Sequence, residues 1–117
     1  MKLINRSAFA IFPRQPFADW ANQQQDELNQ PMSLAEHRAE GNVYLTAEFQ
    51  SEDDVQQQLA AHYQHIFENE LAAWDEFADH WPKERSLALF QEWFEVVPQV
   101  MALDLLQTPL LLAPLED

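Results

Sequence analysis

Glu70 is the residue whose position most suggests chemistry, because it stands inside an apolar stripe that recurs at helical spacing from Val55 to Phe77. A charge buried there without a partner is strongly disfavoured. Two hypotheses account for it. Glu70 is either a proton-carrying catalytic carboxylate in an apolar pocket, or half of a structural ion pair, with Arg6 as the best-placed base. Basic residues are scarce in this chain, but the ion pair is still the favoured interpretation.

His62 and His65 are the second candidate group. They lie three residues apart on the same expected helix, followed by Glu68 and Asn69. Imidazoles at this spacing share a helix face and can share a metal ion, with a carboxylate as third ligand. No Cys and no further His lie close to them in the sequence. We therefore predict no metal and no other cofactor, and regard the two histidines as weak metal candidates.

The acidic residues are unevenly distributed. The chain has 20 acidic and 6 basic residues, a formal charge of −14. The stretch from Glu40 to Asp79 contains no Lys or Arg. Such a field repels phosphates and favours a protein partner with a basic or mixed surface. The runs at 52–54 and 75–79 also permit a further hypothesis, a DNA mimic, although helix capping explains the first run.

Several function classes are excluded by composition. A single glycine rules out a Gly-rich phosphate loop, and the absence of Cys rules out thiol catalysis and fits a reducing compartment. Six basic residues are too few for nucleic-acid binding. No segment approaches the roughly 20 apolar residues of a membrane span, and residues 1–6 are too polar for a signal-peptide core. We expect a cytoplasmic protein without membrane contact.

The elements that must position these groups begin with a strand over residues 7–13. Pro16 suits the first turn of a helix, which is predicted to continue to about Leu28. Ser33 and Glu36 form a capping box, so a short helix follows and ends at Gly41.

The clearest strand covers residues 43–49, where apolar residues alternate with Tyr44, Thr46 and Glu48. This alternation predicts a buried apolar side, Val43 and Leu45 included, and a solvent-facing polar side. The remaining sequence predicts three more elements: a long helix from Ser51 to about Phe77, a short helix after Ser86, and a strand over 96–103. Within that last strand, Pro98 predicts an edge position or a bulge.

These elements predict one α+β domain over residues 1–117, in the order β-α-α-β-α-α-β. The simplest packing is a two-layer sandwich, a small three-stranded sheet covered on one face by helices. The other sheet face is then open, or covered by a second copy in a homodimer. Residues 108–117 form an apolar tail bracketed by prolines, which lies over the surface or docks into a neighbouring subunit.

Four stretches together resemble a family of small acidic bacterial proteins described as conserved hypothetical proteins. They are residues 3–9, residues 66–71 with Trp74, the pair Trp81–Pro82, and residues 92–96. The resemblance covers most of the chain except the Gln-rich stretch and the tail. It implies a cytoplasmic bacterial protein and brings no catalytic residues with it.

Taken together, the sequence favours a non-enzymatic interaction or regulatory module. The expected binding residues are Tyr44, Thr46 and Glu48 on the open sheet face, with Trp81 as an aromatic anchor. The alternative is a small ligand-binding protein or enzyme that uses Glu70. A ligand-sized cavity at Glu70 would favour this alternative, whereas a filled core would favour the interaction module.

Overall fold

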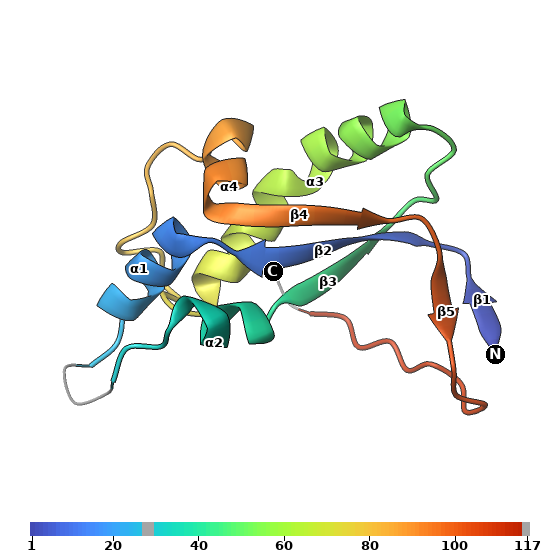
Figure 1. Cartoon of the computed structure of the whole chain (residues 1–117), viewed down its shortest axis with the longest axis horizontal. Helices are drawn as coiled ribbons and strands as arrows, with labels where there is room; N and C mark the ends of the chain where they lie inside the picture. The colour runs from blue at the N-terminus through green and yellow to red at the C-terminus, as the bar shows by residue number, and fades with distance from the viewer. Residues whose placement is uncertain (27–29, 116–117) are drawn as a thin grey trace.

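The chain forms a three-stranded antiparallel sheet with helices on one face and a two-stranded arm at one end (Figure 1). This computed structural model describes residues 1–26 and 30–115. The mixed α+β class and the order of the seven central elements are as predicted, whereas the separate two-stranded arm was not predicted. The elements are β1 (Lys2–Ile4), β2 (Ser7–Pro13), α1 (Gln15–Gln23), α2 (Leu34–Ala39), β3 (Asn42–Thr46), α3 (Glu52–Ala72), α4 (Leu87–Trp93), β4 (Phe94–Gln99) and β5 (Ala102–Asp104).

The sheet has the strand order β3-β2-β4, and both outer strands run antiparallel to β2. In Figure 1, α3 and α4 lie behind the strands, while α1 and α2 lie toward one end of them. Apolar side chains of β2 meet those of α3 and α4 in a core rich in aromatic rings. The buried core residues are Phe9, Ile11, Phe17, Trp20, Ala21, Phe49, Leu59, Ile66, Phe67, Leu71, Phe90 and Phe94.

The first two helices largely follow their sequence signals. Pro16 lies in the first turn of α1, which ends at Gln23; the predicted end at Leu28 lies outside the described residues. The capping box before α2 is confirmed, because the Ser33 hydroxyl accepts from the Glu36 backbone N–H and the Glu36 carboxylate accepts from the Ser33 N–H. No helix in the described part of the chain is long and apolar enough to cross a membrane.

Helix α3 ends earlier than its apolar stripe predicts. The stripe extends to Phe77, but the helix ends at Ala72 and Phe77 is exposed. The backbone N–H groups of Trp74 and Asp75 both donate to the Leu71 carbonyl, at 3.1 and 2.9 Å, and so close the last turn. The chain then leaves the helix axis, which removes Phe77 from the core.

In strand β3, the side that faces the helices is not the side that the alternation predicts. Tyr44 is the cross-strand partner of Phe9 in β2, and direct partners project from the same face. Because Phe9 points into the core, Tyr44 also faces the helices. Val43 and Leu45 project from the other face and are 63% and 53% exposed. The prediction that Val43 and Leu45 are buried and Tyr44 is solvent-facing is therefore wrong.

The reason for this reversal lies at the end of β3. The strand ends at Thr46, and the chain then bends before α3 begins. The bend turns Phe49 inward, and its ring lies 5.3 Å from the ring of Phe9. Phe49 therefore reaches the core from the loop, independently of the strand alternation that appeared to bury it.

The predicted strand over 96–103 is divided into β4 and β5. β4 begins two residues earlier than predicted, at Phe94, and it is an edge strand, as Pro98 requires. β5 leaves the sheet and pairs with β1 instead. Together, β1 and β5 form an arm that projects from the sheet (Figure 1).

The arm bends away from the sheet at a β-bulge. Between the paired positions of the arm and the sheet, residues 5–7 on one strand face only residues 100–101 on the other. Ser7 fixes this corner, because its buried hydroxyl donates to the Val100 carbonyl and accepts from the Phe49 N–H, both at 2.8 Å. One side chain thus joins the arm, the sheet and the loop before α3.

Candidate functional site

Glu70 lies under β3 and is 7% exposed. Asn42 and Tyr44, alternate residues of β3, both donate hydrogen bonds to Glu70 Oε2, the first at 2.8 Å. Asn69 donates to the Tyr44 hydroxyl oxygen at 2.8 Å. The carboxylate is therefore bound by neutral donors, which satisfy a buried charge without a basic residue.

The predicted ion pair between Glu70 and Arg6 is not formed. Arg6 lies at the bend between β1 and β2, where its guanidinium donates to the Asn5 carbonyl at 2.8 Å. The reversal of β3 explains the difference, because it brings a hydroxyl and an amide to Glu70. The sequence contains one indication of this arrangement: Asn42 and Tyr44 are two residues apart on the polar side of the strand, so both can reach the same carboxylate.

Tyr44 has a strongly altered acidity. Burial raises the pKa of Tyr44 above its ordinary value, and the negative charge of Glu70 and its hydrogen bond raise it further. The folded protein thus holds the phenolic proton more tightly than the unfolded chain does. Stability from this group is present below about pH 10 and is lost as the pH rises above it.

We expect the Tyr44 phenol to stay protonated at alkaline pH while the fold persists. The Tyr63→Phe variant leaves Tyr44 as the sole tyrosine, so phenolate absorbance then reports on it alone. The phenolate signal should appear well above pH 10, and adding Glu70→Gln should lower its midpoint. A midpoint near pH 10 with native circular dichroism would contradict this result.

A cleft of about 390 Å³ lies between β3 and α3. It combines an apolar floor with hydroxyl, amide and imidazole groups, which is the composition of many small-ligand sites. Tyr44 lines the cleft, whereas Glu70 is not among the described residues that do. The lining residues are Phe9, Tyr44, Leu45, Thr46, His62, His65, Ile66, Asn69 and Leu115.

His62 and His65 both lie on the rim of this cleft and are exposed. Within residues 1–26 and 30–115, no group of three His, Cys, Asp or Glu side chains is placed to hold a metal ion. The pair therefore contributes polar groups to the cleft wall. Among the described side chains, no carboxylate is placed as the third ligand that the sequence spacing allowed.

The second candidate surface is the open face of the sheet. Val43 and Leu45 of β3 flank Ala8 and Ala10 of β2, their cross-strand partners, and Val97 of β4 follows on the other side. The exposed side chains of Val43 and Leu45 form an apolar surface beside the small alanines. Burying such a surface against a partner is favourable by about 25 cal/mol per Å².

One corner of the open face carries a fixed charge pair. Arg38 of α2 forms an ion pair with Glu95 of β4, donates to the Pro13 carbonyl at 3.1 Å, and lies 5.3 Å above the Phe12 ring. The hydrogen bond from Arg38 lowers the pKa of Glu95. We call this surface, made of Val43, Leu45, Ala8, Ala10 and Val97 with the Arg38–Glu95 pair, the open face; Ala8 itself is buried within it.

No protein-family model, curated protein or solved structure matches this chain. The resemblance drawn from the sequence therefore stays a prediction.

The other predicted binding residues do not gather with the open face. Thr46 is buried and donates to the Gln58 side chain of α3, while Glu48 is exposed in the loop after β3. Trp81 is half-buried, and its ring lies 5.5 Å from the Arg85 guanidinium. Of the predicted sheet-face residues, Tyr44 and Thr46 thus belong to the side that faces α3.

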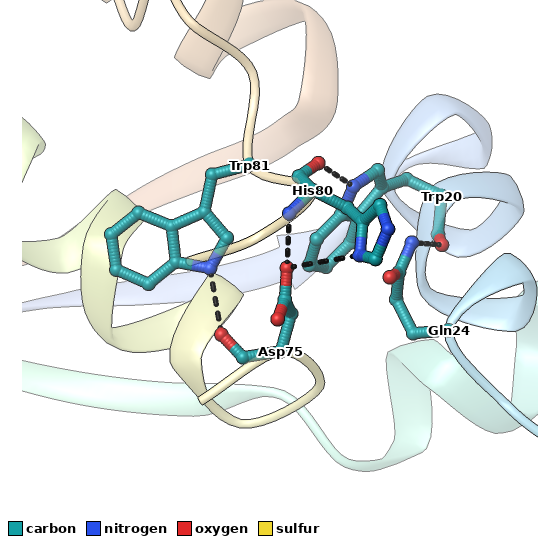
Figure 2. A network of polar contacts seen from close by, with 5 residues as sticks. All are labelled: Trp20, Gln24, Asp75, His80 and Trp81. Atoms are coloured by element: carbon teal, nitrogen blue, oxygen red, sulfur yellow. Dashed lines mark hydrogen bonds and ion pairs between the residues drawn. The ribbon is translucent and has the colours of Figure 1, made fainter. Parts of the chain in front are cut away.

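Asp75 is held in a polar network at the end of α3 (Figure 2). Its Oδ2 accepts from the His80 backbone N–H at 2.6 Å, and its carbonyl accepts from Trp81 Nε1 at 2.8 Å. The His80 carbonyl accepts from Trp20 Nε1 at 2.9 Å, which joins this loop to α1. Asp75 is turned toward the loop, so it does not support the outward carboxylate row that a DNA mimic needs.

Proposed function

We propose that this chain is a cytoplasmic, non-enzymatic protein-interaction module that binds a protein partner through the open face. The observation that carries the proposal is the exposure of Val43 and Leu45 on a regular strand. Apolar side chains on an ordered sheet face, beside small alanines, are typical of a contact surface. The absence of Cys fits the proposed compartment.

The charges around the open face limit the kind of partner. Glu40 and Glu48 lie just before and just after β3, and both are exposed. The residues from Glu40 to Asp79 include no Lys or Arg. A partner with an apolar centre and a basic rim would bury Val43 and Leu45 and meet the acids around them.

The test compares proteins captured from a cell lysate by the unmodified chain and by the Val43→Ser/Leu45→Ser variant. A partner of the open face should bind the variant at least about tenfold more weakly, because side chains central to an interface contribute about 1–2 kcal/mol each. It should also be retained less well as salt rises, since salt screens its basic rim.

Phe77→Ser is the matched control, because Phe77 is exposed and lies outside the open face. This variant should capture the same partner as the unmodified chain. Circular dichroism should be the same for all three proteins. Capture that the Val43→Ser/Leu45→Ser change does not alter would contradict the proposed function.

A second candidate function is small-ligand binding in the cleft between β3 and α3. Its volume of about 390 Å³ is in the range of natural ligand sites, and the Tyr44, His62 and Asn69 side chains offer polar contacts. Glu70 supports this site through Tyr44 rather than by touching a ligand. Protection of His62 from chemical modification by a bound small molecule would favour this function over the first.

A further inference from the structure

We infer that the β1–β5 arm is a self-association surface, through which two copies of this chain pack arm against arm. This inference uses a surface separate from the open face, so it does not depend on the proposed function. It follows from the area that the chain exposes, from the two faces of the arm, and from the distribution of charge.

The chain exposes far more surface than a compact domain of its size. Its accessible surface is 8469 Å², whereas a compact monomer of this mass exposes about 6,600 Å². Its radius of gyration is 15.7 Å, against about 13 Å for a compact domain of this length. The excess of about 1,900 Å² exceeds the roughly 800 Å² that each partner buries in a standard interface.

Most of this exposed apolar surface belongs to the arm and the segment after it. Figure 1 shows the arm projecting from the sheet and the red tail returning from it. Of the large hydrophobic side chains that are exposed within residues 1–26 and 30–115, three lie elsewhere: Val43, Leu45 and Phe77. Those of the arm and tail are Met1, Leu3, Val100, Met101, Leu103, Leu105, Leu106, Leu110, Leu111, Leu112 and Leu115.

The two faces of the arm differ. On one face, Leu110 of the tail lines a shallow hollow together with Lys2, Ile4 and Asp104, at whose edge Leu3 also lies, and Lys2 Nζ donates to the Gln107 carbonyl at 3.0 Å. The tail thus folds back over this face.

On the other face, Leu3 and Leu103 are direct cross-strand partners and project together. They are 61% and 51% exposed. Two leucines side by side on an ordered ribbon form a flat apolar patch. A two-fold axis through this patch would bring it against its own copy, which is the geometry of an isologous dimer.

The charge distribution selects a second copy as the occupant. Residues 7–99 carry 17 acidic and four basic side chains, so two such bodies repel each other. In the sequence, residues 1–6 and 100–117 carry two bases, Lys2 and Arg6, and three acids, Asp104, Glu116 and Asp117, so they are nearly neutral. Arm-to-arm contact therefore joins the parts of the chain that repel least and keeps the acidic bodies at opposite ends.

The experiment is sedimentation equilibrium of the full chain at micromolar concentration in moderate salt. The unmodified protein should have the mass of two chains. Leu3→Ser/Leu103→Ser should weaken the dimer at least about 100-fold, because the change removes four apolar side chains from one interface. Raising the salt should strengthen the unmodified dimer, since salt screens the repulsion between the bodies.

Val43→Ser/Leu45→Ser is the matched control, with two similar apolar losses on the open face, and it should leave the dimer intact. Circular dichroism should show that both variants keep the fold. A monomer at every concentration, or a dimer that the Leu3→Ser/Leu103→Ser change leaves intact, would overturn the inference. A dimer lost in the control variant would overturn it too, by assigning self-association to the open face.

Cross-linking gives a second readout, because the chain contains no Cys. Leu103→Cys introduces a unique thiol on the arm, and a short bismaleimide should join two copies through it. Leu45→Cys introduces an equally exposed thiol on the open face and should give no covalent dimer. Equal cross-linking at the two positions, or cross-linking at Leu45→Cys alone, contradicts arm-to-arm contact.

Discussion

Phe67→Ala is expected to lower the free energy of unfolding by about 4 kcal/mol, the largest loss that we predict for a single side chain. Phe67 lies on α3 and is fully buried. Its ring centroid is 5.5 Å from that of Phe90, 5.7 Å from that of Trp93 and 5.8 Å from that of Phe94. Removing the ring leaves a cavity among rigid aromatic groups that cannot close around it. Urea unfolding followed by tryptophan fluorescence measures the loss.

Phe77→Ala is the matched control. The same atoms are removed, and the same apolar stripe of the sequence contains both residues, but Phe77 is exposed. The change should alter the free energy of unfolding by less than about 0.5 kcal/mol. Comparable losses at the two positions would mean that α3 continues to Phe77 and covers it, contrary to the structure.

The two phenylalanines also mark how far the apolar stripe of α3 can be interpreted from sequence. Period 3.6 predicts which helix face is buried, and Leu59, Phe67 and Leu71 confirm it. Periodicity cannot fix where the helix ends, because the end depends on contacts with distant residues. Here Asp75 accepts from the His80 and Trp81 N–H groups, and the loop that forms removes Phe77 from the stripe.

Strand β3 shows the same limit in another form. Alternation correctly predicted a strand from residue 43, but it did not determine which side faces the helices. That choice is made by partners elsewhere in the chain, since Glu70 accepts from Tyr44 and Gln58 accepts from Thr46. A strand whose polar side finds hydrogen-bond partners on a helix can leave Val43 outside. An open sheet face was therefore expected from the sequence, but the residues that lie on it could not be identified.

The arm could not be predicted for a related reason. Residues 2–4 and 102–104 are too short to show a strand pattern alone, and their pairing joins opposite ends of the chain. The buried hydroxyl of Ser7, which fixes the bend, resembles any other strand serine in sequence. Pro98 did predict the edge position of β4 correctly, because its missing N–H is a local property.

Tyr44→Phe is the second large effect, an expected loss of about 2 kcal/mol in the free energy of unfolding. The change removes a donor from the buried carboxylate of Glu70 and leaves it with Asn42 as its hydrogen-bond donor among the described side chains. It also removes the acceptor of the Asn69 amide. Hydrogen bonds to charged groups contribute more than neutral ones, so the loss should exceed that of an ordinary hydroxyl. Urea unfolding at neutral pH measures it.

Tyr63→Phe is the control for Tyr44→Phe, because the Tyr63 hydroxyl contacts the Arg85 carbonyl at 3.4 Å, too long for a strong hydrogen bond. It should cost less than about 0.5 kcal/mol. A double-mutant cycle with Glu70→Leu then isolates the pair: without the carboxylate, Tyr44→Phe should cost at least about 1 kcal/mol less. A coupling near zero would mean that the Tyr44–Glu70 bond does not stabilise the fold. A variant Glu70→Leu more stable than the unmodified chain would mean that the carboxylate is not kept for structure.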